Sequence, residues 1–156
     1  MKALTRSSMD ALRRSIAGLR APGLEDRPLR PALQALCVDF AQRTSLEVTC
    51  QIDQAADDLR PATAEALWRI TQEALTNVEK HAQARSVNVS LEYKPDAVTL
   101  RVVDDGVGLS AGAESLPNRF GIRGMRERVE GLGGTLALGS GASGTTVEAR
   151  LPVVRV

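Results

Sequence analysis

Apolar residues alternate with polar ones in several short segments, and this two-residue period is the feature that most constrains the fold. In a β-strand, successive side chains point to opposite faces, so each such segment can bury one face and leave the other in solvent. The alternating segments are residues 46–52, 87–93, 98–102, 135–138 and 146–151. The sequence therefore predicts a sheet of half-buried strands.

Helical periodicity occupies the apolar segments between these strands. Apolar residues recur at steps of three and four, as on one face of a helix, over roughly residues 29–43, 61–82 and 121–132. Pro61 suits the first turn of the second helix, and Gly133 follows the last turn of the third. We expect an α/β (α+β) two-layer sandwich, with the helices packed on one face of a mixed, mainly antiparallel sheet.

The first residues of the chain differ from the rest. Within residues 1–20, Met9, Leu12, Ile16 and Leu19 form the narrow apolar seam of a coiled coil or helical bundle. Prolines and a glycine then break the pattern over residues 21–28, which suits a linker. The predicted organisation is a helix over 1–20, a linker over 21–28 and a domain over 29–156.

Composition excludes some functions. Hydrophobic residues make up 43% of the chain and aromatic residues only 3%, so the core must be aliphatic and platforms for stacking nucleic-acid bases are not expected. The formal net charge of +1 also argues against nucleic acid or an anionic membrane as the main partner. Without a signal peptide or an apolar run of about 18 residues, the chain is expected to be cytoplasmic, or the cytoplasmic part of a longer protein.

The two cysteines, Cys37 and Cys50, both lie in apolar periodic segments. Buried thiols are expected there rather than a disulfide, because a small thiol behaves as an apolar side chain. Two cysteines alone cannot form a structural zinc site.

The long predicted helix carries the first group of residues that suits chemistry. Glu73, Asn77, Lys80 and His81 fall within an arc of about 100° beside the apolar face of the helix. An amide oxygen can ligate Mg²⁺, an amine can neutralise phosphate, and a carboxylate can orient or deprotonate a nucleophile. Spacing alone leaves a solvated helix face as the alternative.

A glycine-containing segment directly follows the strand that ends near Val103. It reads Asp104-Asp105-Gly106-Val107-Gly108. Glycines allow a sharp turn and close approach to a flat ligand, and the acid at the strand end could accept a hydrogen bond from an amino group. The alternative is an ordinary Asp-Gly turn.

Two further glycine-containing segments could indicate a nucleotide site, and only the first is retained. Gly121 and Gly124 open a predicted helix, where free backbone N–H groups attract anions, although a glycine-rich helix start is an equal alternative. Residues 139–144 match the spacing of a dinucleotide-binding motif, but a strand rather than a helix follows. A Rossmann site is therefore rejected.

Taken in order, these segments resemble the motifs of bacterial sensor histidine kinases. Residues 69–82 resemble the N box, residues 103–108 the D-x-G-x-G element, residues 121–129 the second glycine box, and residues 144–147 the final G-T element. The wording of the first and third segments resembles the NarL/DesK-like subfamily, which usually partners LuxR-type (NarL-like) response regulators. The resemblance covers roughly residues 27–156.

The resemblance implies a Bergerat ATP-binding fold that uses ATP and Mg²⁺. In that fold Asn77 would coordinate Mg²⁺, Lys80 and His81 would lie near the phosphates, and Glu73 would be the general base or an orienting carboxylate. Asp104 would accept a hydrogen bond from the adenine amino group. The remaining implied ATP-binding residues are glycines and threonines of the later motifs: Gly106, Gly108, Gly121, Gly124, Thr145 and Thr146. Residues 109–120 would form the ATP lid.

The implied function is transfer of the ATP γ-phosphate to a histidine on a dimerisation domain of the same kinase, for relay to a LuxR/NarL-type response regulator. His81 belongs to the N box, and residues 1–20 would be the C-terminal part of a dimerisation helix, so the chain should bind ATP but barely autophosphorylate. The parent protein would be a homodimer, and its anchoring in the inner membrane is left open. An anti-sigma-type serine kinase and a degenerate nucleotide-binding regulatory module are the alternatives.

Overall fold

The computed structural model describes residue 24 and residues 27–108 and 121–153. The predicted N-terminal helix over 1–20 and the predicted lid over 109–120 lie outside the described residues. The elements in chain order are α2 (Leu29–Thr44), β1 (Glu47–Ile52), the 3₁₀ helix η2 (Gln54–Asp58), α3 (Pro61–Asn77), the π-helical turn η3 (Val78–Ala82), β2 (Ser86–Tyr93), β3 (Ala97–Asp104), α4 (Ile122–Glu130), β4 (Thr135–Gly141) and β5 (Gly144–Pro152).

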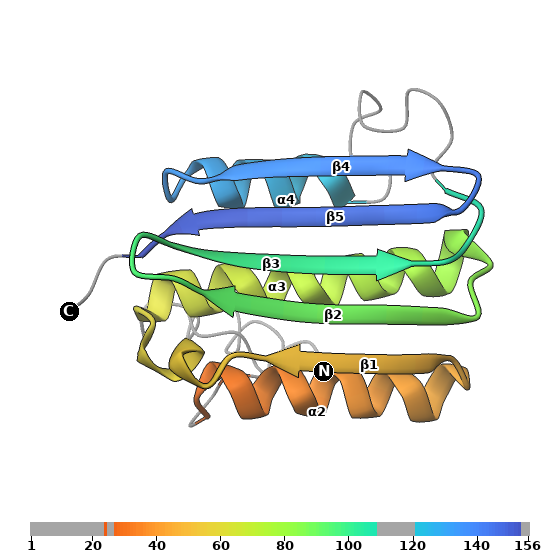
Figure 1. Ribbon diagram of the computed structural model, residues 1–156, viewed down its shortest axis with the longest axis horizontal. Helices are drawn as coiled ribbons and strands as arrows, with labels where there is room; N and C mark the ends of the chain where they lie inside the picture. The colour runs from red at the N-terminus through yellow and green to blue at the C-terminus, as the bar shows by residue number, and fades with distance from the viewer. Residues whose placement is uncertain (1–23, 25–26, 109–120, 154–156) are drawn as a thin grey trace, which may run out of the picture.

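The strands form one sheet in the order β1-β2-β3-β5-β4. The β1–β2 pair is parallel and the other pairs are antiparallel. Helices α2, α3 and α4 lie together on one face of this sheet (Figure 1). The predicted two-layer sandwich on a mixed, mainly antiparallel sheet is confirmed. Strand β5, the last of the described strands, lies between β3 and β4.

The core lies between the two layers and is aliphatic, as the composition predicts. On β5, Val147, Ala149 and Leu151 are buried toward the helices, whereas the intervening residues face the open side of the sheet. The helices bury side chains such as Leu33 and Ile70 against them. The period of two in the sequence thus corresponds to one buried and one solvated face.

The predicted long helix over 61–82 is not uniform. Regular α-helix ends at Asn77, and Val78–Ala82 form a single π-helical turn that closes at Gln83 with φ 51°. A π turn closes i→i+5 hydrogen bonds instead of the i→i+4 bonds of α-helix, so its side chains point in other directions than a continued α-helix would give. Such turns are rare and occur frequently at functional sites. We call residues 78–82 the π turn.

Cys37 is buried and Cys50 is half-buried, and both are free thiols. The prediction of a buried thiol is confirmed for Cys37 and holds only in part for Cys50. A hydrogen bond to Cys50, together with burial, raises the pKa of the Cys37 thiol well above its usual range. Among the described helices, none is both long enough and apolar enough to cross a membrane.

Candidate functional site

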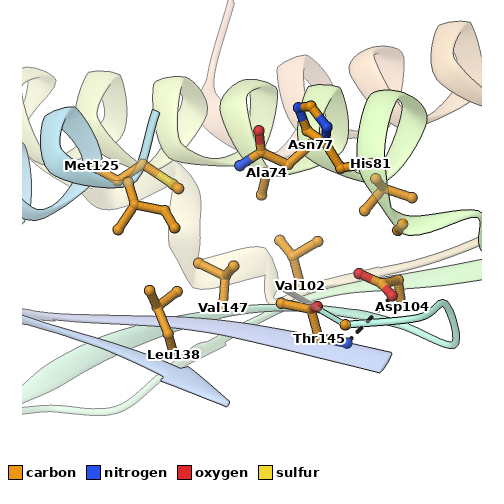
Figure 2. Close-up of a pocket in the computed structure, with 13 residues that line it drawn as sticks. Ala74, Asn77, His81, Val102, Asp104, Met125, Leu138, Thr145 and Val147 are labelled. Atoms are coloured by element: carbon orange, nitrogen blue, oxygen red, sulfur yellow. Dashed lines mark hydrogen bonds between the residues drawn. The ribbon is translucent and has the colours of Figure 1, made fainter. Parts of the chain in front are cut away.

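A cavity that opens to solvent lies between the helical layer and the sheet, where β3 and α3 end. Figure 2 shows the side chains of α3 and α4 on one side of the cavity and those of β3, β4 and β5 on the other.

Most of the cavity wall is apolar. Ala74 of α3 and Met125 of α4 line it from the helical layer, and Val102, Leu138 and Val147 line it from the sheet (Figure 2). Aliphatic side chains on two opposed sides form a slot that suits a flat, weakly polar ring.

A single buried carboxylate closes one end of this slot. Asp104 at the end of β3 is only 7% exposed, and its Oδ1 accepts hydrogen bonds from the backbone N–H groups of Gly106 (2.8 Å) and Thr145 (3.3 Å). Both hydrogen bonds that described residues donate to this carboxylate end on Oδ1. Burial raises the pKa of Asp104, and the two backbone hydrogen bonds oppose that shift only in part. Asp104 is therefore a desolvated acceptor beside the cavity.

The neighbouring Asp105 has the opposite environment. Its exposed carboxylate accepts hydrogen bonds from the backbone N–H groups of Arg85 (2.8 Å) and Ser86 (2.9 Å) and from the Ser86 hydroxyl (3.0 Å). These bonds hold the pKa of Asp105 below its usual value. Asp105 thus links the start of β2 to the end of β3, a structural role that has no signal in the local sequence.

Asn77 and His81 line the cavity from the helical side, across from Asp104 and Thr145 (Figure 2). Glu73 and Lys80 do not line it. Lys80 is exposed on the π turn. The predicted arc of four residues assumed a continuous α-helix, whereas Lys80 and His81 lie on the π turn and, of the four, Asn77 and His81 line the cavity.

Glu73 lies beside the second glycine box instead. A Cβ atom on Gly121 would lie 1.8 Å from Glu73 Oε1, so the carboxylate rests directly against this glycine. Gly121 has φ 67° and precedes α4, a conformation that favours glycine. The structure therefore brings together residues of the N box and of the second glycine box that lie far apart in sequence.

The segment Asp105–Gly108, which we call the glycine loop, packs against the π turn on one side and the β4–β5 hairpin on the other. A Cβ atom on Gly106 would lie 2.0 Å from the carbonyl oxygen of Ala82 in the π turn. Gly108, with φ 81°, would bring a Cβ atom to 2.3 Å from the carbonyl oxygen of Gly141 in the β4–β5 hairpin. Gly108 lines the cavity, whereas Gly106 does not and packs against the Ala82 carbonyl.

The two threonines of the final motif, Thr145 and Thr146, point to opposite faces of β5 because successive strand residues alternate. Thr145 is buried and lines the cavity, whereas Thr146 lies on the opposite face of β5 and does not line it. Gly124 on α4 is exposed and also lies outside the lining.

Gly124→Ala should raise the stability of the domain. The position lies inside a helix, its backbone is not in the left-handed region, and no heavy atom lies within 4 Å of the added Cβ. Alanine at such a site is more favourable than glycine by about 0.5–1 kcal/mol. Urea denaturation measures this gain, and a loss of stability would show that α4 is not the unstrained helix described. Gly121→Ala is the matched control and should destabilise, because Gly121 has φ 67° in the left-handed region, where a Cβ atom is strained.

The fold and the cavity define a nucleotide-binding sandwich of the ATPase type. A family model described as histidine kinase-, DNA gyrase B-, and HSP90-like ATPase matches residues 62–155, and the chain belongs to this family.

Known proteins of this family agree with that assignment. The sensor histidine kinase MctS of Rhizobium johnstonii is 36% identical over 143 residues, which cover 90% of this chain and 31% of MctS. The histidine-protein kinase/phosphatase UhpB of Salmonella typhimurium is 36% identical over 145 residues, 92% of this chain and 28% of UhpB. The chain therefore spans about a third of the length of these relatives.

A solved structure supports the same class. The blue-light activated histidine kinase of Erythrobacter litoralis EL346 superposes with a TM-score of 0.70 at 25% identity, over 83% of this chain and 43% of that chain. Together, these likenesses identify a histidine kinase-type ATPase catalytic domain.

Proposed function

We propose that this chain binds ATP with Mg²⁺ in the cavity and transfers the γ-phosphate to a histidine on a dimerisation domain of the same kinase, for relay to a response regulator. The observation that carries the proposal is the buried carboxylate of Asp104 at the end of an apolar slot, with Asn77 and His81 across from it. An apolar slot suits the adenine ring, and an amide and an imidazole at its edge suit the phosphate end.

Asp104 accounts for recognition of the base. Backbone donors already occupy Oδ1, so the carboxylate is held in one orientation and can accept the adenine amino group through Oδ2. Guanine carries a carbonyl oxygen where adenine carries that amine, which would set an acceptor against a buried carboxylate. A hydrogen bond to a charged group contributes about 1.5–3 kcal/mol, so ATP should bind at least about tenfold tighter than GTP.

Residues on the helical side of the cavity would bind the phosphates and Mg²⁺. Asn77 would offer its amide oxygen to Mg²⁺, which when bound would neutralise charge on the phosphate oxygens. His81 would donate to a phosphate from the next turn, and Lys80 would approach from solvent. Glu73, fixed against Gly121, would orient the incoming histidine. We also propose that Gly106, Gly108, Gly124, Thr145 and Thr146 belong to the ATP-binding motifs.

The whole protein is proposed to be a homodimer of the NarL/DesK-like subfamily, with residues 1–20 as the end of a dimerisation helix and a LuxR/NarL-type regulator as partner. The wording of the N box and of the second glycine box supports this subfamily. A histidine phosphate is labile in acid, whereas the phosphate that an anti-sigma-type serine kinase would form is stable. A degenerate module would bind ATP and label neither residue.

Calorimetric titration with ATP and GTP, each with and without Mg²⁺, tests the nucleotide site. Wild type should bind ATP at least about tenfold tighter than GTP, and Mg²⁺ should strengthen ATP binding. Asn77→Ala should remove the Mg²⁺ dependence. Asn88→Ala is the matched control, because Asn88 is exposed on the open face of β2. A folded wild-type chain that binds no ATP at millimolar concentration, or an Asn77→Ala variant that keeps the Mg²⁺ dependence, would contradict the proposal.

A further inference from the structure

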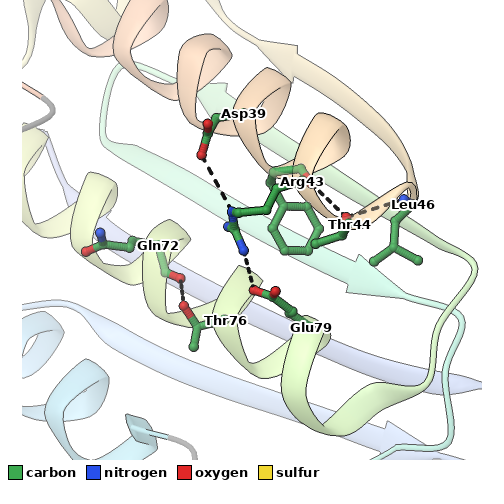
Figure 3. Close-up of polar contacts among 8 residues, drawn as sticks. Asp39, Arg43, Thr44, Leu46, Gln72, Thr76 and Glu79 are labelled. Carbon is green, nitrogen blue, oxygen red and sulfur yellow. Dashed lines mark hydrogen bonds and ion pairs between the residues drawn. The ribbon is translucent and has the colours of Figure 1, made fainter.

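An ion pair joins α2 to the π turn, outside the cavity. Arg43 near the end of α2 donates from Nη1 to Oε1 of Glu79 at 2.6 Å (Figure 3). The guanidinium also lies 3.8 Å from the carboxylate of Asp39 and 5.7 Å from the centroid of the Phe40 ring. Phe40 is only 1% exposed, so this ring is a fixed surface under the guanidinium. Three neighbours therefore restrict Arg43 to an orientation that faces the π turn.

The helix end that carries Arg43 is itself held in place. The hydroxyl of Thr44 donates to the carbonyl oxygen of Phe40 (2.7 Å) and accepts from the backbone N–H of Leu46 (3.3 Å) (Figure 3). Ser45 closes the helix in the left-handed region with φ 62°, and its N–H donates to the carbonyl oxygen of Ala41. Arg43 thus projects from a capped helix terminus, which limits its freedom to follow a moving partner.

The opposite end of the π turn is attached to the glycine loop. The carbonyl oxygen of Ala82 accepts from the backbone N–H of Val107 at 2.7 Å, and Gly106 leaves no space beside that carbonyl. Between the two attachments lies His81, and Asn77 directly precedes the turn; both line the cavity. The π turn is therefore fixed on its outer side by Glu79 and at its end by Ala82.

We propose that Arg43 and Glu79 are positioning residues of the nucleotide site, acting through the π turn. A π turn is a less common helical form than α-helix and persists where its surroundings hold it. Without the Glu79 anchor, residues 78–82 can relax toward α-helix, which rotates His81 and withdraws the Ala82 carbonyl from Val107. The consequence for nucleotide affinity rests on the proposed function; the consequence for the Ala82–Val107 bond does not.

The expected effect is local and moderate. The side chains of Arg43 and Glu79 are 52% and 38% exposed, so solvent screens their attraction and the pair adds little to global stability. We expect loss of the pair to speed opening of the Ala82–Val107 hydrogen bond, and to weaken ATP binding, by about three- to fivefold.

Amide hydrogen exchange of Val107, measured by NMR on the nucleotide-free chain, is the primary test. Exchange should be about three- to fivefold faster in Glu79→Ala and in Arg43→Ala, with little further change in the double variant, because both single changes remove one interaction. Glu79→Gln, which keeps an acceptor for Arg43, should exchange more slowly than Glu79→Ala. The control is Asp96→Ala, which removes the Arg150–Asp96 ion pair (3.3 Å) next to the start of β3, at the opposite end of that strand from Asp104. It should leave Val107 unchanged.

Two exchange results would overturn the positioning role. One is an unchanged Val107 amide in Glu79→Ala. The other is equal acceleration at Val107 and at the buried Leu100 of the central strand β3, which would mean that the pair contributes only to global stability. Calorimetry on the same variants should show ATP affinity weakened in parallel with Val107 exchange. If wild type itself binds no ATP, the proposed function fails, and the exchange data still decide whether Arg43 and Glu79 position the π turn.

Discussion

Asp104→Asn is expected to abolish ATP binding while leaving the nucleotide-free domain at least as stable as the wild type. An asparagine side chain can still present an oxygen to the N–H groups of Gly106 and Thr145, so the local backbone keeps both hydrogen bonds. The other group of the asparagine amide is an NH₂ donor. It would face the adenine amino group, also a donor, where the carboxylate oxygen of Asp104 would accept a hydrogen bond. We expect at least about a hundredfold loss of affinity, the sum of a lost charged hydrogen bond and an unmatched pair of donors.

The stability of the nucleotide-free domain should depend on pH in a direction that the raised pKa of Asp104 determines. Burial raises the pKa of Asp104 above its ordinary 3.8, so between the unfolded and the folded pKa the folded state binds the extra proton. The contribution of Asp104 to stability is therefore fully present below the unfolded pKa and is lost as the pH rises through the folded pKa. The Asp104→Asn variant has no carboxyl at this position, so its free energy of unfolding should not fall in this way as the pH rises. Urea denaturation of the nucleotide-free wild type and variant from pH 4 to 8 measures the difference in their free energies of unfolding.

Asp105→Asn is the matched control, because the two acids are adjacent and their pKa values shift in opposite directions. Backbone hydrogen bonds lower the pKa of Asp105, so its contribution to stability is present above the unfolded pKa and is lost as the pH falls through the folded pKa. Its removal should lower stability at neutral pH and leave the preference for ATP over GTP intact. If Asp104→Asn retains ATP affinity within threefold of wild type, Asp104 does not recognise the base.

Gly144→Ala should be the most destabilising of the substitutions considered. Gly144 has φ 130°, and an added Cβ would lie 1.9 Å from the carbonyl oxygen of Asp104, a backbone atom that cannot rotate away. Strained backbone costs about 1–3 kcal/mol and overpacking about 1–3 kcal/mol, so we expect a loss of roughly 2–5 kcal/mol in the free energy of unfolding. The same displacement would move the Asp104 carboxylate and weaken nucleotide binding.

Gly141→Ala is its control in the same hairpin. Gly141 has no heavy atom within 4 Å of an added Cβ and no positive φ, so its substitution should change stability by less than about 0.5 kcal/mol. Chemical denaturation of the two variants side by side separates the close contact at Gly144 from the general cost of altering a turn. Equal stability of the two variants would contradict the contact between Gly144 and Asp104.

The sequence allowed the fold class and most strand positions to be predicted, because alternation and helical period follow directly from which face is buried. The alternation in β5 also predicts which of its residues face the helices and which face the open side of the sheet. Val147, Ala149 and Leu151 already share one face, and Thr145 continues their series whereas Thr146 does not. The sequence therefore contained enough information to select Thr145 alone as the threonine that lines the cavity.

The π turn could not be predicted in the same way. Nothing in the local residues 78–82 demands an extra residue in the turn; its surroundings include Arg43 on α2 and Val107 on the glycine loop, both distant in sequence. For the same reason the sequence could not show which residues of the predicted arc line the cavity; Asn77 and His81 do, whereas Lys80 is exposed on the π turn. The contact of Glu73 with Gly121 also depends on the packing of α4 against α3 and has no local signature.

The position of β5 has a consequence for synthesis of the protein on the ribosome. Chains emerge from the N-terminus, and β5 is the last described strand to appear. Yet β5 pairs with both β3 and β4, and the N–H of Thr145 on β5 donates to the Asp104 carboxylate. Among the described residues, a nascent chain that stops before Gly144 leaves β4 without a neighbouring strand and Asp104 without the Thr145 donor. The domain should therefore become able to hold a nucleotide only after this strand has been synthesised and has entered the sheet between β3 and β4.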